Sequence, residues 1–340
     1  MPKKTPEEII QDIEISKRAK EILKKDLFKT FWEVARRWEK IRRNIDINKV
    51  CKYGIRIIDE YMGGIWDSEL VVIGADSGIG KSEIAYNIAF TNALIGKKVC
   101  LFALEWDVNE IGYRFMQRRV NERLKTRFVK SIEYRFNMRE DINYIIDEEM
   151  ETMRQEISEN ITIYDDYELP DLHALTELIE LVKDDVDMIV IDHLHYLQYI
   201  WDNESRGIWE VMRWLKRITD KMHKPIVLIS HLKRRKTDED PTGQDFYGSS
   251  NIEKEATTTL FVCKGKDEWK FDKAWNPTRK KETKFIIGKS RMWWPRGKFL
   301  VKYDTIEKRY CDDEKDDQTL DPECMDISSH SVANLSRKYL

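Results

Sequence analysis

A lysine and a serine stand side by side where a phosphate group could bind. The segment from Ala75 to Ser82 reads ADSGIGKS and directly follows the apolar run Leu70 to Ile73. That run predicts a buried strand, and the residues after the segment predict a helix. A strand, a glycine-bearing loop and a helix in this order are the setting of a P-loop, whose backbone N–H groups surround a phosphate at a helix N-terminus. The segment therefore predicts nucleotide binding.

The residues of this loop have separate predicted tasks. Lys81 would reach the β- and γ-phosphates of a nucleotide, and the Ser82 hydroxyl would occupy one Mg²⁺ position. Ala75 replaces the usual first glycine, which is a mild change because the position needs a small residue. A chance glycine turn is the alternative, and the GKS sequence in this context argues against it. The predicted nucleotide-binding residues are Ala75, Asp76, Ser77, Gly78, Ile79, Gly80, Lys81 and Ser82.

Two further apolar runs, Val99 to Leu104 and Met188 to Asp192, lead to acidic residues. The first is followed by Glu105, where a carboxylate beside a P-loop can act on the water that attacks the γ-phosphate. An ordinary helix N-cap acid is the alternative at this point of the chain. The second run has the Walker B pattern, which delivers Asp192 to the Mg²⁺ shell opposite Ser82.

Three histidines need separate interpretations. The strand predicted over 225–230 leads into His231, which either contacts the γ-phosphate or is a histidine satisfied at a strand edge; from the residues alone the two are equally favoured. His193 and His195 are two residues apart, as in some metal sites. Because no further Cys or His is nearby in the sequence, we expect one of them to pack and the other to point to a loop.

Composition indicates the cellular compartment but does not decide whether the protein binds nucleic acid. No apolar run approaches the length of a membrane span, the N-terminus MPKKTPEEII lacks a signal-peptide core, and the five cysteines show no CxxC spacing. We therefore expect a soluble, intracellular protein in the cytoplasm. The net charge of −3 conceals a balance of −5 over residues 312–340, which leaves +2 for the rest of the chain. A nucleic-acid surface would thus be a local patch.

The chain is expected to have three parts: an N-terminal helical segment over 1–50, an α/β ATPase domain over 51–311, and an acidic, disordered tail over 312–340. An apolar stripe in the first part falls on one helix face and could pack on its own core or on a neighbour; its residues are Leu27, Phe31, Val34, Trp38 and Ile41.

In the middle part, strands alternate with helices, which predicts a mostly parallel sheet. Residues 110–156 are expected to be helical, with their arginines on a solvated face. Helices are predicted over 172–182 and 208–222, and strands over 160–164, 256–264, 284–287 and 299–303. The polar stretch 233–250 is expected to be a long loop whose cations could bind nucleic acid.

With these motifs the chain resembles the RecA-like motor domain of hexameric replicative DNA helicases, the DnaB and phage primase–helicase group of superfamily four. The similarity runs from about 54 to 310 and includes ADSGIGKS, FALEWD, NITIYDD, MIVIDHLHYL, IVLISHLKR, FYGSSNIEKEAT and IIGKSR. The GKSR segment is more specific to the family than the P-loop, which many ATPases share. The resemblance implies a RecA-like P-loop NTPase core.

The resemblance also implies roles for individual residues. Glu105 would be the catalytic base, His231 the γ-phosphate sensor, and Lys289 and Arg291 would act on the nucleotide of the adjacent subunit as an arginine finger does. Tyr303 would stack on the base, and the N-terminal helix with its Leu27-to-Ile41 stripe would be the linker that docks on the next subunit. Single-stranded DNA would be held in the central channel by the loop residues Lys233, Arg234, Arg235, Lys236, Gly248, Ser249 and Ser250.

The function that this resemblance implies is an ATP- and Mg²⁺-dependent DNA helicase that moves on single-stranded DNA as a homo-oligomeric, hexameric ring, in the replication of a phage or mobile element. A primase or loader would be a separate partner, because neither a primase nor a DnaB-type N-terminal domain is recognisable, and no membrane is involved. A RecA- or RadA-like recombinase without unwinding activity is the alternative, which the GKSR segment disfavours. A regulatory module with a degraded site is disfavoured by the intact Lys81, Ser82, Glu105 and Asp192.

Overall fold

The structure of the protein is a computed structural model, and the chain divides into two units, residues 1–49 and 50–340. Each unit is described by itself. The structure describes residues 30–44, 50–76, 79–124, 140–166, 171–196, 204–233, 239–247, 251–265, 280–291, 296–304 and 309–310. The predicted acidic tail lies outside the described residues.

The first unit contributes one described helix, α3 (Phe31–Asn44). A capping box starts it: the Thr30 N–H donates to Glu33 Oε2 at 2.7 Å, and the Glu33 N–H donates to Thr30 Oγ1 at 3.3 Å. Phe31 and Val34, two members of the predicted stripe, are exposed. What they pack against stays a prediction.

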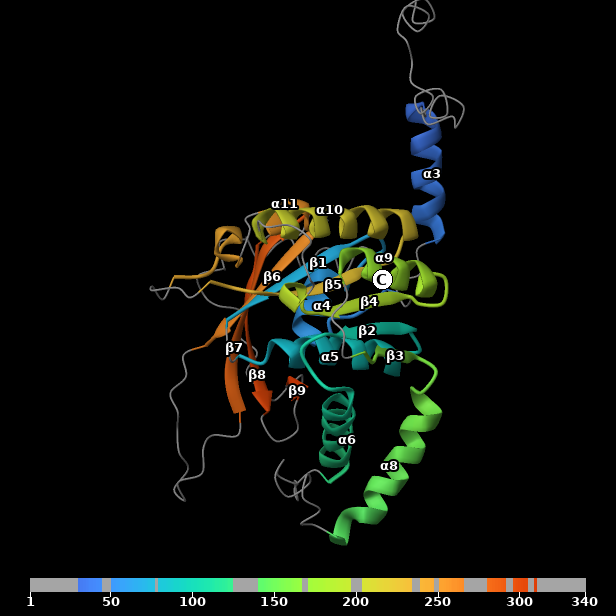
Figure 1. Cartoon of the computed structure of the whole chain (residues 1–340), viewed down its shortest axis with the longest axis vertical. Helices are drawn as coiled ribbons and strands as arrows, with labels where there is room; N and C mark the ends of the chain where they lie inside the picture. The colour runs from blue at the N-terminus through green and yellow to red at the C-terminus, as the bar shows by residue number, and fades with distance from the viewer. Residues whose placement is uncertain are drawn as a thin grey trace, which may run out of the picture. The chain divides into compact units, whose positions relative to one another are not determined.

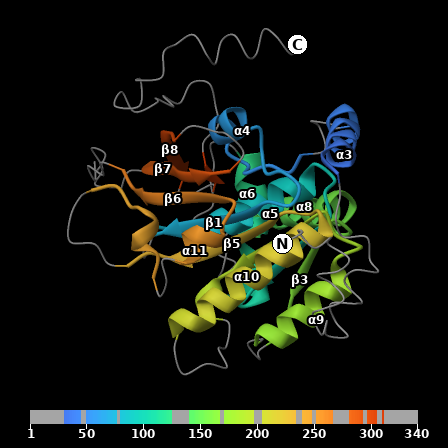
Figure 2. The ribbon, with the colours of Figure 1, turned by 90° about the horizontal axis from the view of Figure 1, so that it is seen from above.

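The second unit is built on a nine-stranded sheet among its described residues, in the order β3-β2-β4-β5-β1-β6-β7-β8-β9 (Figures 1 and 2). The strands from β3 to β6 in this order pair in parallel, and β7 to β9 are added antiparallel. Their bounds are β1 Leu70–Ala75, β2 Val99–Ala103, β3 Ile161–Tyr164, β4 Met188–Asp192, β5 Ile226–His231, β6 Thr258–Lys264, β7 Lys280–Ser290, β8 Lys298–Asp304 and β9 Arg309–Tyr310.

Helices cover both faces of the sheet, because the central strands are apolar on both sides (Figure 1). Val71 and Ile73 of β1 join one core with α4 (Arg56–Met62), α5 (Lys81–Leu94) and α6 (Val108–Leu124). Leu70 and Val72 alternate onto the other face. There they join a second core with α9 (Leu172–Val182), α10 (Glu204–Met222) and α11 (Asn251–Glu255).

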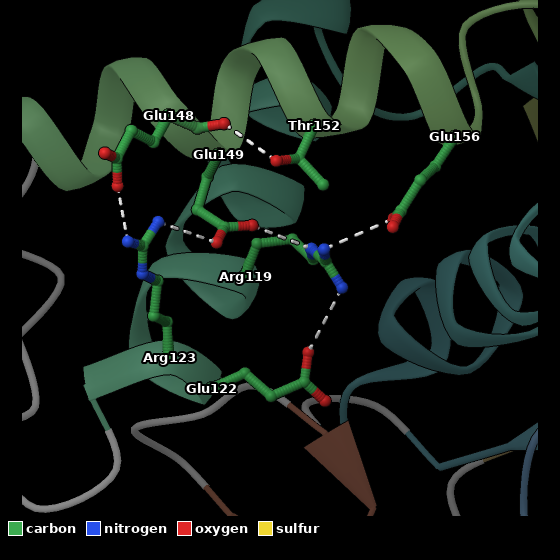
Figure 3. Close-up of polar contacts among 7 residues, drawn as sticks. All are labelled: Arg119, Glu122, Arg123, Glu148, Glu149, Thr152 and Glu156. Atoms are coloured by element: carbon green, nitrogen blue, oxygen red, sulfur yellow. Dashed lines mark hydrogen bonds and ion pairs between the residues drawn. The ribbon is translucent and has the colours of Figure 1, made fainter.

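The charged stretch 110–156 is helical where the structure describes it, as predicted, but its arginines lie differently from the prediction. It contains α6 and a second helix, α8 (Asn143–Glu156), preceded by the short turn Glu140–Ile142, and residues 125–139 lie outside the described part. A small apolar cluster joins the two helices. Around it, Arg119 and Arg123 of α6 form ion pairs with Glu148, Glu149 and Glu156 of α8 (Figure 3). These arginines are therefore held by acids of another helix, whereas the sequence analysis placed them on a solvated face.

The strand predicted over 284–287 is also longer than expected. As β7 it spans Lys280–Ser290, because it pairs with β6 on one side and with β8 on the other. Gly288 and Lys289 of the GKSR segment consequently lie within a strand.

Candidate active site

The parallel strands gather the predicted catalytic residues at one edge of the sheet. β2, β4, β5 and β1 are consecutive neighbours, and their carboxyl ends lead respectively to Glu105, Asp192, His231 and the P-loop. In an open α/β sheet this edge is where ligands bind. The order of the strands, and not the order of the sequence, therefore brings the four groups side by side.

The described part of the P-loop is shaped for a phosphate. Gly80 is the N-cap residue of α5, with a φ of 88°, a left-handed conformation that favours glycine, and it has no side chain to cap the first turn. The N–H groups of that turn are thus available to an anion. Lys81 and Ser82 begin the helix and are both buried. Ser77 and Gly78 lie outside the described residues, so their predicted contacts stay predictions.

Asp192 is a buried carboxylate that suits a metal ion. Both of its oxygens are buried, and neither has a hydrogen-bond donor in the described part of the chain. Burial raises the pKa of Asp192 to about 6. The Ser82 and Tyr86 hydroxyls lie near enough to oppose this rise, although their geometry falls short of a hydrogen bond. A Mg²⁺ ion between Ser82 and Asp192 would supply the missing positive partner, so these residues fit the predicted metal.

The Lys81 ammonium contacts His231 within the same group of residues. Its Nζ lies 2.6 Å from Nδ1 of His231. Burial lowers the pKa of Lys81, and the carboxylates of Glu105 and Asp192 oppose that shift. Burial also lowers the pKa of His231 to about 4, assisted by the charge of Lys81. His231 is therefore neutral near pH 7 and lies beside the lysine that is predicted to bind the γ-phosphate.

His193 connects His231 with Glu105. Its Nε2 lies 2.8 Å from Nε2 of His231 and 3.3 Å from Oε2 of Glu105. Burial lowers its pKa to about 2. His195 is less buried, and its Nε2 lies 3.3 Å from the carbonyl oxygen of Tyr247. Among the described residues no group of three or more His, Cys, Asp or Glu side chains could hold a metal ion.

Lys289 and Arg291 lie toward the opposite edge of the sheet. Lys289 pairs with Thr259 of β6, and Ser290, just before Arg291, pairs with Thr258. Thr258 in turn pairs with Val71 near the start of β1. Val71 is four residues from Ala75 at the end of that strand, a distance of about 13 Å along the strand. The Arg291 guanidinium donates to the Lys254 carbonyl at 2.8 Å, and the Lys289 ammonium donates to that same oxygen at 3.0 Å. Neither side chain joins the P-loop edge of its own chain.

Tyr303 lies on the P-loop side of the sheet, since it pairs with Lys281 at the start of β7. Its ring contacts that of Tyr310, with the two centroids 5.1 Å apart. Burial raises the pKa of Tyr303. A partly buried tyrosine on this edge is compatible with the predicted stacking on a base, which stays a prediction.

The stretch 233–250 is more ordered than a loop where the structure describes it. Thr242 and Asp245 form a capping box over the turn Gly243–Asp245, and Phe246 is fully buried. Asp240 pairs with Lys284 and Lys298 of neighbouring strands at 2.6 and 2.8 Å. Lys233 is exposed, with its Nζ bonded to the Gln244 carbonyl. The other predicted DNA-binding residues lie outside the described part: Arg234, Arg235, Lys236, Gly248, Ser249 and Ser250.

The comparison with known protein families decides the assignment. A family model described as the DnaB-like helicase C terminal domain matches residues 51–311. The chain belongs to this family. Its N-terminal helix α3 precedes the matched region, and the whole described sheet lies within it.

Curated relatives of this DnaB-like chain are replicative helicases of modest identity. DnaB of Buchnera aphidicola is 25% identical over 249 residues, which is 70% of this chain and 50% of that protein. DnaB of Mycoplasma genitalium is 26% identical over 277 residues, 78% of this chain and 57% of that protein. A probable plasmid replicative DNA helicase of Chlamydia muridarum is 27% identical, over 58% of this chain and 43% of that protein. The chain spans about half the length of the curated relatives it matches.

Solved structures confirm the predicted fold of the DnaB-like domain. A separately solved ATPase domain superposes with a TM-score of 0.69 at 19% identity, over 85% of this chain and all of that domain. A DnaB-like replicative helicase, from a structure concerned with its interactions with primase, gives 0.64 at 19% identity, over 84% of this chain and 67% of that one. The mostly parallel RecA-like α/β core is thus confirmed. No described helix has the length and apolar character that crossing a membrane requires.

Two features of this DnaB-like site escaped the sequence analysis. One is the contact of His193 with both Glu105 and His231; its only signal was its place directly after Asp192, at the end of a central strand. The other is Arg114 of α6, whose guanidinium stacks 3.7 Å from the centre of the Trp106 ring and forms an ion pair with Glu83 in the first turn of α5. Arg114 therefore braces the segment after Glu105 against the P-loop helix.

Proposed function

We propose that this chain is the motor of an ATP-dependent DNA helicase, which assembles as a ring of identical subunits and translocates on single-stranded DNA. We further propose that it serves the replication of a phage or mobile element, with a separate primase or loader as its partner. Membership of the DnaB-like family supports this proposal. So do relatives named as replicative helicases, one of them a probable plasmid helicase.

The observation that carries the proposal is the division of the predicted catalytic groups between two edges of one sheet. Lys81, Glu105, Asp192 and His231 lie at the carboxyl edge of the parallel strands. Arg291 lies toward the other edge, bonded to a backbone carbonyl. A cation that cannot serve its own chain can serve the site of a neighbouring subunit. This division is what a ring with shared active sites requires.

Within one subunit, the residues at the carboxyl edge would divide the work of hydrolysis. Lys81 and the first-turn N–H groups of α5 would bind the phosphates of ATP, and Ser82 and Asp192 would hold Mg²⁺, which when bound neutralises charge that develops on them. Glu105, at 29% side-chain exposure, is accessible enough to accept a proton from water. Arg291 of the adjacent subunit would complete the neutralisation.

ATP turnover measured against protein concentration, with and without single-stranded DNA, tests the proposal. Turnover per subunit should rise with concentration, because each site needs its neighbour, and DNA should stimulate it further. Turnover that is independent of concentration and indifferent to DNA would contradict the ring motor. A forked duplex then separates a helicase from a recombinase-like ATPase, since only the helicase releases the strand in an ATP-dependent manner.

A further inference from the structure

His193 lies between two groups whose action must be coordinated. Sheet order places β4 between β2 and β5, so the residue after Asp192 falls between Glu105 and His231. The His193 side chain is only 1% exposed, whereas that of Glu105 is 29% exposed. The histidine is thus fixed in place, and the carboxylate beside it has room to move.

The ring of His193 is oriented from both sides. Nδ1 accepts the backbone N–H of His195 at 3.3 Å. Nε2 faces two partners, Nε2 of His231 at 2.8 Å and Oε2 of Glu105 at 3.3 Å. The His193 and His231 rings meet edge to face, with centroids 4.2 Å apart and an 82° angle between their planes. One nitrogen atom of His193 therefore serves both the predicted sensor and the predicted base.

The contacts of this cluster cannot all be hydrogen bonds at once, because a neutral imidazole carries a single N–H. The Lys81 ammonium can only donate, so its 2.6 Å contact requires Nδ1 of His231 to accept. His231 then carries its proton on Nε2, and this N–H donates a hydrogen bond to the Nε2 lone pair of His193. In that arrangement His193 has no N–H at Nε2 to offer Glu105.

The second arrangement follows when the Lys81 ammonium turns from His231 toward a phosphate. Each ring keeps its single proton: on His231 it moves from Nε2 to Nδ1, so that Nε2 becomes an acceptor, and on His193 it moves from Nδ1 to Nε2. A charged carboxylate is a stronger acceptor than an imidazole nitrogen, so Glu105 takes this hydrogen bond. The bond from the His195 N–H to Nδ1 of His193 is compatible only with this arrangement.

We propose that His193 is a positioning residue, which holds Glu105 for water activation when Lys81 engages phosphate and releases it when Lys81 returns to His231. The proposal rests on the proposed ATPase function and adds the step that connects phosphate binding with the placement of the base. The histidine touches neither the nucleotide nor the water in this scheme; it acts through Glu105.

The test compares His193→Gln with His193→Asn in the full chain, with single-stranded DNA present. The Gln amide can place an N–H near the position of Nε2, whereas the shorter Asn reaches only the position of Nδ1. We expect Asn, and likewise His193→Phe, to lower kcat about tenfold or more, with KM for ATP within about twofold of wild type. Gln should recover most of kcat. The matched control is His173→Asn, at an exposed histidine of α9.

A second measurement separates positioning from a structural role. In a Glu105→Asp background the shorter carboxylate is out of reach of His193, so His193→Asn should cause no further loss of kcat. Equal kcat for Gln and Asn, a parallel loss of nucleotide affinity, or an undiminished effect in the Asp background would overturn the proposal.

Lys81→Ala, measured in the same assay, distinguishes a failure of the proposed function from a failure of this inference. If wild-type turnover survives Lys81→Ala, the proposed ATPase site is wrong. If Lys81→Ala removes turnover while His193→Asn and His193→Phe leave kcat unchanged, only the role of His193 is wrong.

Discussion

Two polar clusters of this molecule are built on opposite principles. In the cluster between α6 and α8, positive and negative charges alternate, and Arg119 contacts three carboxylates at 3.1 to 3.8 Å (Figure 3). At the carboxyl edge of the sheet, Lys81 faces an imidazole, and Asp192 is buried without a hydrogen-bond donor among the described residues. The first cluster pairs its charges within the protein, whereas the buried carboxylate of Asp192 has the chemistry to bind a cation.

The difference teaches where stability and function reside. Buried polar groups without partners lower the stability of the folded state, and they persist where a ligand supplies what is missing. Paired groups on adjoining helices stabilise the fold and need no ligand. Substitutions in the two clusters should therefore have different effects. Those at the sheet edge should remove activity and leave stability unchanged, and those between α6 and α8 should lower stability and leave activity unchanged.

The largest effect is expected for Lys81→Ala. Removal of the ammonium deletes the predicted phosphate contact, so ATP turnover should fall to background, a loss of more than about 1000-fold. Stability should change by less than about 1 kcal/mol, because the lost group is a partly desolvated cation. ATP turnover and urea unfolding measure the two effects. Lys221→Ala on the surface of α10 should alter neither, and a large loss of stability in Lys81→Ala would contradict the separation.

Arg291→Ala extends the comparison to the site of a neighbouring subunit. Turnover should fall about 1000-fold while nucleotide binding is retained, since the guanidinium contributes to the transition state and not to its own P-loop. Mixing with Glu105→Gln subunits should restore activity, because about a quarter of the interfaces in randomly mixed rings would pair an intact base with an intact arginine. Normal hydrolysis by Arg291→Ala would show that the finger assignment is wrong.

Glu149→Gln tests the other cluster. This buried carboxylate accepts from Arg119 at 3.1 Å and contacts Arg123 at 3.4 Å. Its neutralisation should lower the free energy of unfolding by about 1–2 kcal/mol, while turnover per folded molecule stays unchanged. The matched control is Glu151→Gln on the exposed side of α8, which should leave unfolding unaltered. Loss of turnover at equal stability would mean that α6 and α8 serve the catalytic site directly.

The sequence predicted the elements whose signals are local. The helix expected over 172–182 and the strand expected over 188–192 coincide with α9 and β4. An apolar run that ends in a polar residue predicts both a buried strand and a functional side chain at its tip. For this reason Glu105, Asp192 and His231 could be proposed as site residues before their neighbours were known, and their roles stay predictions.

The sequence could not predict the contacts between segments that lie far apart in the chain. Arg119 and Glu149 are 30 residues apart in the chain, and nothing local indicates that their helices pair. Gly288 and Lys289 have weak strand preferences, yet pairing with β6 extends β7 through them. The bridge made by His193 requires β4 to lie between β2 and β5, which is a property of the sheet order alone.

The smallest effect is expected where the site meets the predicted DNA-binding loop. The His195 ring bonds to the carbonyl of Tyr247, and the Tyr247 N–H donates to the His231 carbonyl at 3.0 Å, directly before Gly248. Because one hydrogen bond between neutral groups contributes about 0.5–1 kcal/mol, His195→Ala should lower the stimulation of turnover by DNA roughly two- to fivefold. Turnover without DNA should remain as in wild type. His173→Ala is the control, and an unchanged stimulation ratio would mean that DNA acts on the site by a route that bypasses His195.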